Sequence, residues 1–452
     1  MKLYASITAS AFIAISGSAF GDNTTSHEQV GTDNMAATDQ TEAGFGNSII
    51  KRQIGSGNEV TGTQEDGVIN SSILSTQTGN QNEATIIQSG GVSLSAINSQ
   101  VGSQNTAEIT QEFSIGSQVS IRQLGTSNAS YIEQRFGSGN AFTSTQDGES
   151  HFFLGRQEES ANSNIFVFQD GERQSAVVEE TGGNIGSSVL IFQFDRDDFA
   201  TVSLVATING TLDIFQDGSD SYGGLAQFSS VDSTMTLRQT DNRHFAFANQ
   251  ALSLFSDILI IQRLGDANIT SITQTGTLNS IELRQNGAGN NVTLEQSAVD
   301  SSIDITQTGA TNQVTGSQLS SKFSTIDSRQ FAIDNVLTVN QGGLLVSATN
   351  EQSGLQNVAN IEQAGTEIDL FTRQIGFNNR ADFRQTGDSL SITSRQFGNN
   401  NDISITQGGD SNSSFSLQIG NNHTKEITQT GSNGRAFNFQ TGGNSNTGVI
   451  TQ

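Results

Sequence analysis

The stretch QTGNQNEATIIQ, Gln77 to Gln88, opens and closes on glutamine, with Gly79, Asn82 and Ala84 between. The same residue types return at the same offsets in three further stretches: QVGSQNTAEITQ (Gln100 to Gln111), QSGLQNVANIEQ (Gln352 to Gln363) and QIGFNNRADFRQ (Gln374 to Gln385). Recurrence at fixed spacing is the mark of a repeat architecture, in which one structural unit is built many times.

The glutamines of this motif form a regular comb along the chain. Counted from Gln53, they recur every eleven or twelve residues, and from Gln285 to Gln440 nearly every step is eleven. Glu180 takes the place of one missing glutamine, and Leu and Val stand near 204 and 205. The comb weakens between about 170 and 260, where Phe residues accumulate: Phe192, Phe194, Phe199 and Phe215.

The six residues before each glutamine alternate in character. Asn82, Ala84, Ile86 and Gln88 fall on one face of an extended chain. Alternation with period two predicts a half-buried strand. A glycine two positions after many of the glutamines supplies the positive φ that a tight turn requires. Each step is therefore predicted to be one strand followed by a turn.

Strands of this kind can follow one another as a meander or wind into a coil. In a coil, two steps of about 22 residues close one rung, and the next rung lies about 4.8 Å above it. Identical side chains then stack, and Gln and Asn amides bond the rungs above and below as in cross-β ladders. A meander gives the glutamines no reason to recur at constant depth, so the pattern favours an all-β solenoid with on the order of 18 rungs.

This interpretation assigns two roles to the motif residues. The amides expected to form structural ladders are Gln77, Asn82, Gln88, Gln100, Asn105, Gln111, Gln123, Asn128, Gln134, Gln352, Asn357, Gln363, Gln374, Asn379 and Gln385. The expected turn glycines are Gly79, Gly102, Gly125, Gly354 and Gly376.

The composition fits a chain made almost wholly of strands. The sequence has no proline, which cannot donate to a β ladder and is kept out of interior strands. It also has no cysteine, so disulfides cannot stabilise it. The formal net charge of −25 disfavours nucleic acid as a partner, because phosphate binding needs clustered Lys and Arg.

The chain divides into three expected segments. Residues 1–21 place Lys2 before an apolar stretch that ends in small residues, which predicts a secretory signal peptide, with a short buried helix as the alternative. Residues 22–46 are expected to be an N-terminal segment outside the comb, and residues 47–452 the solenoid. No later stretch reaches the roughly 18 apolar residues of a membrane span, so no membrane insertion is expected.

Catalytic and metal-binding arrangements are not apparent in the sequence. The four histidines have no Ser, Asp or metal-ligand pattern around them and are expected to be turn or surface residues. Asp195, Asp197 and Asp198, and the pair Asp217 and Asp220, only faintly suggest calcium ligands, since the EF-hand spacing fails. We therefore expect no enzyme activity, no cofactor and no metal.

The motif Ser-x5-Gln-x-Gly-x2-Asn-x-Ala-x3-Gln resembles the curlin repeat, found in subunits of the bacterial functional amyloid curli. Residues 71 to 88 match it at every specified position, and Gln123 to Gln134 match except for Ser130 in place of Ala. The resemblance covers about residues 47 to 452. Familiar curlins are much shorter, and their N-terminal export segment is Gly-rich, whereas residues 22–45 are not.

The resemblance implies a secreted structural subunit that polymerises with copies of itself into extracellular fibres for cell adhesion and biofilm matrix. It also implies a nucleating subunit and an outer-membrane secretion pore as partners, at the surface of a Gram-negative-type bacterium. The comb continues to Gln452 without cap residues, which fits a strand edge open to another chain. A monomeric secreted solenoid, acting as an adhesin or ligand-binding protein, is the alternative. A β-helix enzyme acting on polysaccharide fits less well, because the steps are too uniform to carry long inserted loops.

Overall fold

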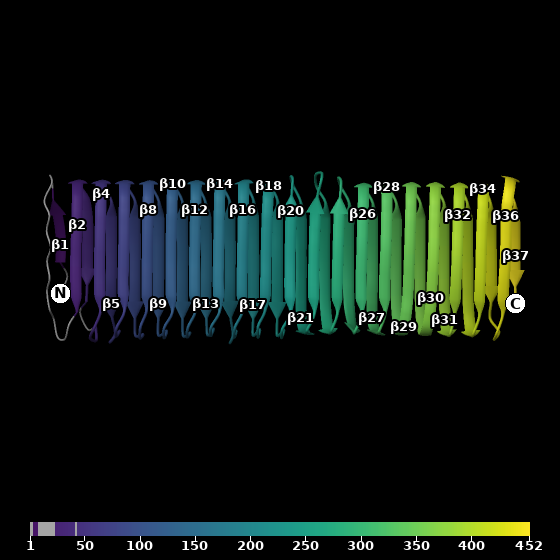
Figure 1. The fold of residues 1–452 in the computed structure, drawn as a ribbon, viewed down its shortest axis with the longest axis horizontal. Coiled ribbons are helices and arrows are strands. Elements are labelled where there is room, and N and C mark those ends of the chain that lie inside the picture. Colours follow the sequence, from purple (N-terminus) through teal and green to yellow (C-terminus); the bar gives the residue numbers. More distant parts are fainter. Residues whose placement is uncertain (1–2, 8–22, 41–42) are drawn as a thin grey trace. The chain divides into compact units, whose positions relative to one another are not determined.

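A computed structural model describes residues 3–7, 23–40 and 43–452 (Figure 1). Every regular element in the described residues is a β-strand. The chain forms two compact units, Met1–Val231 and Asp232–Gln452.

The strands of the first unit are mostly seven or nine residues long and are separated by short turns. They are β1 (Leu3–Ile7), β2 (Thr24–Thr32), β3 (Asn34–Asp39), β4 (Ser48–Ser56), β5 (Glu59–Glu65), β6 (Ser72–Asn80), β7 (Glu83–Ser89), β8 (Ser95–Ser103), β9 (Thr106–Glu112), β10 (Gln118–Thr126), β11 (Ala129–Arg135), β12 (Ala141–Glu149), β13 (Phe152–Glu158), β14 (Asn164–Glu172), β15 (Ser175–Thr181), β16 (Ser188–Arg196), β17 (Phe199–Val205), β18 (Thr211–Ser219) and β19 (Tyr222–Phe228).

The second unit continues the same plan, except that β29 and β30 each run through a corner and supply a strand to both faces. Its strands are β20 (Thr234–Thr240), β21 (Phe245–Leu254), β22 (Asp257–Arg263), β23 (Ile269–Thr277), β24 (Ser280–Asn286), β25 (Asn291–Val299), β26 (Ser302–Ala310), β27 (Gln313–Lys322), β28 (Thr325–Ile333), β29 (Val336–Leu355), β30 (Val358–Phe377), β31 (Arg380–Asp388), β32 (Ser391–Asn399), β33 (Asp402–Asp410), β34 (Ser413–Asn421), β35 (Thr424–Gln429), β36 (Arg435–Asn444) and β37 (Thr447–Thr451).

Apart from β1 and the corner-spanning β29 and β30, strands pair with the strand two places further on, parallel and largely in register. β6 pairs with β8 and β8 with β10, so that Gln77, Gln100 and Gln123 lie in one column. Such pairing is possible only if two successive strands complete one lap of a coil. Among the described residues, the strands β2 to β19 make nine laps in the first unit. Ten laps follow in the second unit. The predicted two-strand β-solenoid is confirmed, and the meander is excluded.

The core of each unit is the thin space between its two sheets. Along β9 the side chains alternate between inside and outside, so that Ala107, Ile109 and Gln111 are buried while Glu108 is exposed. Apolar and amide side chains therefore share the interior. Ile86 and Ile109 are both fully buried, as are the glutamines beside them. Burial of amides at this depth requires that each one finds hydrogen-bond partners.

The coil begins earlier in the chain than the sequence analysis expected. Strand β2 pairs in parallel with β4, and β3 with β5, so these strands form a lap of the same kind as the rest. The expected boundary between an N-terminal segment, residues 22–46, and the solenoid therefore does not coincide with a change of fold. The proposed signal peptide, residues 1–21, lies outside the described residues except for β1, which pairs antiparallel with β3.

Candidate functional site: the stacked amides

The glutamine side chains form two columns of hydrogen bonds in the first unit. On one face, Gln77 Nε2 donates to Gln100 Oε1 at 2.8 Å, and Gln100 Nε2 donates to Gln123 Oε1 at 2.9 Å. On the other face, Gln88 donates to Gln111 and Gln111 to Gln134, both at 2.9 Å. Every donor points toward the following lap, so the columns are directional.

The second unit repeats this arrangement. Gln352 Nε2 donates to Gln374 Oε1 at 2.9 Å, and Gln363 Nε2 donates to Gln385 Oε1 at 2.9 Å. The second amide proton goes to a backbone carbonyl, as in the bond from Gln352 Nε2 to Val336 O at 3.0 Å. With both protons and the oxygen engaged, a fully buried amide avoids the cost of an unpaired polar group.

Asparagines form a third kind of column at the turns, with the opposite direction. Asn105 Nδ2 donates to Asn82 Oδ1 of the preceding lap at 2.9 Å and to Gly125 O of the following lap at 3.0 Å. The Asn105 backbone N–H also donates to Asn82 Oδ1, at 3.2 Å. The same pattern links Asn357 to Asn335 and Asn379 to Asn357 at 3.0 Å. The Oδ1 of Asn128 likewise accepts a backbone N–H of the next lap, that of His151, at 3.0 Å. Each asparagine thus fixes a turn to both of its neighbours.

The turn glycines also stack, and their backbones approach closely. Gly102 has a φ of +122°, and a Cβ built on it would lie 1.9 Å from the carbonyl oxygen of Gly125. A side chain at this position would therefore clash with the next lap in addition to straining the backbone. The other glycines singled out from the sequence have the same kind of φ and the same close contact, namely Gly79, Gly125, Gly354 and Gly376.

Sequence reasoning missed the first members of the glutamine columns. Gln29 Nε2 donates to Gln53 Oε1 at 2.6 Å, and Gln40 Nε2 donates to Gln64 Oε1 at 2.7 Å. The signal was present, because Gln29, Gly31, Asn34, Ala36 and Gln40 reproduce the motif position by position. The comb was counted from Gln53 onward, so these earlier motif residues were not included in it.

Three histidines take positions in the asparagine columns at the turns, so of the two expected locations, turn or surface, the structure shows the turn. His151, His244 and His423 are all buried, and each ring Nε2 lies within hydrogen-bond distance of the backbone carbonyl four residues earlier. Burial lowers the pKa of His151 and of His244. Imidazole replaces the asparagine amide here because it also offers one donor and one acceptor when neutral.

Two carboxyl groups interrupt the columns in the first unit. Glu180 accepts a hydrogen bond from Gln157 Nε2 at 2.9 Å, but the next residue in its column is Leu204. Burial raises the pKa of Glu180 to about 7. Asp198 takes an asparagine position and accepts the Ser221 N–H at 3.0 Å; burial raises the pKa of Asp198 to about 8. Among the described residues of the first unit, Glu180 and Asp198 are the only buried acids.

The acidic residues considered as possible calcium ligands lie in different environments. Asp197 forms an ion pair with Arg173, with 2.7 Å between Asp197 Oδ1 and Arg173 Nε, whereas Asp198 is buried. Within the described residues, no group of three or more His, Cys, Asp or Glu side chains is arranged to hold a metal ion. The part of the chain that the structure covers also has no helix of the length and apolar character needed to cross a membrane.

The geometry defines a class of protein: a parallel β-solenoid whose interior is held by stacked amide columns. Three stretches of the chain, residues 116–148, 277–309 and 398–431, match the family model of the curlin associated repeat. The chain therefore contains curlin-type repeats, which confirms the resemblance seen in the sequence. No curated protein matches the chain in sequence.

Proposed function

We propose that this protein is a secreted structural subunit that polymerises into curli-like amyloid fibres for cell adhesion and biofilm matrix. The curlin repeats point to a fibre subunit, and both the repeat and the solenoid are structural, not enzymatic, in character. Export through an outer-membrane pore, assembly on a nucleating subunit and a place on the surface of a Gram-negative-type bacterium belong to the same proposal.

The observation that carries the proposal is that successive laps present the same hydrogen-bonding side chains. The bond from Gln77 to Gln100 joins side chains of one type at one depth, and so does the bond from Gln374 to Gln396. A lap of a second copy offers the same donors and acceptors in the same places. A sheet edge of this kind is a template for another chain, as in cross-β assemblies.

The test is assembly kinetics of residues 22–452 purified from denaturant. Thioflavin T fluorescence is expected to rise after a lag, and preformed fibres are expected to shorten that lag, because an existing edge removes the nucleation step. A chain that folds and remains a monodisperse monomer for days would contradict the proposal and would favour the monomeric adhesin or ligand-binding protein.

A further inference from the structure

Five phenylalanines form a connected band on the outer face of β14, β16 and β18. Phe192 contacts Phe166 and Phe168, with ring centroids 5.5 and 6.3 Å apart. Phe194 contacts Phe168 and Phe215, at 5.7 and 5.5 Å. The rings point away from the core, and all five are partly exposed. Three members of the band, Phe192, Phe194 and Phe215, belong to the stretch in which the glutamine comb weakens.

Nothing in the amide columns requires these rings. In the preceding lap, the residue in register with Phe168 is Thr145, a polar residue on the same outer face. An apolar band on the outside of a flat sheet costs solubility, and such patches mark surfaces of interaction. The band is therefore better explained by something that binds it than by the fold.

Two carboxylates flank one ring of the band, one on each side. Phe194 is in register with Asp170 of the lap before and with Asp217 of the lap after, each about one strand spacing of 4.8 Å away. Both carboxylates are exposed, and among the described residues neither takes part in an ion pair. An aromatic face between two carboxylates is complementary to an organic cation.

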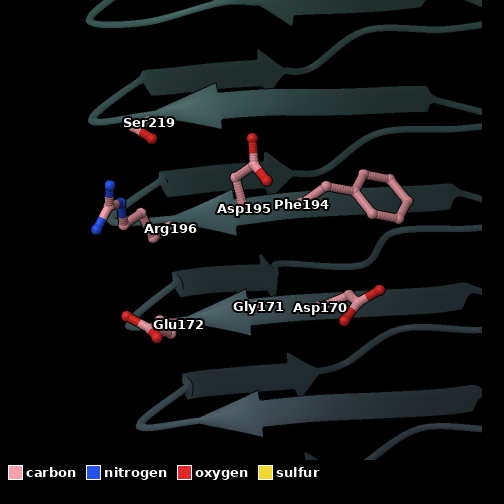
Figure 2. Close-up of a pocket in the computed structure, with 7 residues that line it drawn as sticks. All are labelled: Asp170, Gly171, Glu172, Phe194, Asp195, Arg196 and Ser219. Carbon is pink, nitrogen blue, oxygen red and sulfur yellow. The ribbon is translucent and has the colours of Figure 1, made fainter.

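A shallow depression of about 530 Å³ opens beside Phe194. Asp170, Glu172 and Asp195 contribute carboxylates to its lining, and Arg196 is the single cation (Figure 2). Asp195 stands where the laps on either side have Gly171 and Gly218, so a third acid replaces a glycine next to the ring. Glu172 is ion-paired with Arg173, so the surplus of negative charge in the depression comes from Asp170 and Asp195.

We propose that this surface, formed by the phenylalanine band with Asp170 and Asp217, binds arginine side chains of a basic peptide or protein segment. A guanidinium is planar, so it stacks on the face of Phe194 while its N–H groups donate to the two carboxylates. The aliphatic stem of the arginine covers the neighbouring rings of Phe168 and Phe215. A sugar fits less well, because the depression offers mainly acceptors for hydrogen bonds. The inference does not depend on fibre formation.

The test is calorimetric titration of the soluble full chain with an acetylated, amidated Arg-Gly-Arg-Gly-Arg peptide, with the corresponding citrulline peptide as neutral control. The arginine peptide is expected to bind and the citrulline peptide to fail. Asp170→Asn combined with Asp217→Asn is expected to weaken binding by about tenfold, the sum of two exposed charge pairs. Phe194→Leu is expected to weaken it by about threefold, because the aromatic face is lost while the apolar area is kept.

The matched control is Asp388→Asn combined with Asp410→Asn. These two exposed acids are also stacked in register, and their replacement changes the net charge by the same amount in the second unit. The affinity of this control variant for the arginine peptide is expected to stay within twofold of the wild-type affinity. Equal weakening by both double variants would overturn the proposal, because it would reduce the effect to net charge. Sedimentation of the chain alone that shows self-association lost on Asp170→Asn and Asp217→Asn would also overturn it, by making a second copy the occupant.

Discussion

At Gln100 the side-chain amide accepts a hydrogen bond from Gln77 and donates to Gln123. It also donates to the backbone carbonyls of Glu83 and Asn105, at 2.8 and 3.0 Å. The residue is fully buried, so water cannot replace any of these partners. A glutamine of this kind stabilises the fold through both neighbouring laps at once.

Replacement of Gln100 by leucine is therefore expected to cost about 1–3 kcal/mol of folding free energy, since the amides of Gln77 and Gln123 each lose a partner in the core. Gln104→Leu provides the control, because Gln104 is an exposed turn glutamine only four residues away. The urea midpoint of the soluble chain measures both. A midpoint for Gln100→Leu as high as that of Gln104→Leu would show that the columns contribute nothing.

The sequence predicts which residues occupy the columns but not the direction of their bonds. Glutamine and glycine positions follow from the motif, since a constant period in a coil places equal residues above one another. Glutamines donate to the glutamine of the next lap, whereas Asn105 donates to the asparagine of the preceding lap. Only the backbone geometry reveals that difference. The burial of His151 could not be predicted either, because histidine is not part of the motif.

At the scale of the strand, β15 and β17 are where the regular columns are weakest. Glu180 on β15 is buried with its Oε1 lacking a described hydrogen-bond partner, and Leu204 on β17 follows it in the column. Burial raises the pKa of Glu180 from its ordinary 4.5 to about 7. A folded-state pKa above the unfolded value means that stability is full at low pH and is lost as the pH rises through about 7.

Glu180→Gln is expected to remove this pH dependence. Relative to the variant, the wild-type chain should lose about 3 kcal/mol of unfolding free energy between pH 4 and pH 9. Lys51 and Lys425 act in the opposite direction, because burial lowers the pKa of each to about 7, but they are the same in both proteins and cancel in the comparison. Urea unfolding of the soluble chain across this pH range measures the difference.

Glu179→Gln is the matched control for that experiment. Glu179 is the adjacent residue on β15, and its side chain is exposed. The variant should follow the wild-type pH profile. If Glu180→Gln follows that profile as well, the buried carboxyl does not titrate in the way the structure implies.

Strand positions over most of the chain could be predicted from the comb, because an alternating pattern and a turn glycine fix each strand within a few residues. Two features could not. The strands β29 and β30 continue through corners where other laps have a break, which the uniform step of eleven residues does not distinguish. The first lap, β2 and β3, was missed because its Gln29 lies 24 residues before Gln53, beyond the expected segment boundary.

At the scale of the whole molecule, the amide columns of the interior and the phenylalanine band on the outer face have separate roles. The interior columns repeat over most laps and are the basis of the proposed fibre, while the phenylalanine band lies on β14, β16 and β18 and is the basis of the proposed binding of a cation. The formal charge of −25 fits the proposed binding of a basic partner.

The central claim is that glutamine amides of successive laps bond one another directly. Solid-state NMR tests it most directly, on a folded preparation in which every glutamine is labelled at random with either nitrogen or carbon isotope, half and half. Magnetisation transfer is expected from Nε2 of one glutamine to Cδ of another, because a hydrogen bond holds these atoms roughly 4 Å apart. Absence of that transfer in a sample whose backbone signals show parallel, in-register strands would contradict the account.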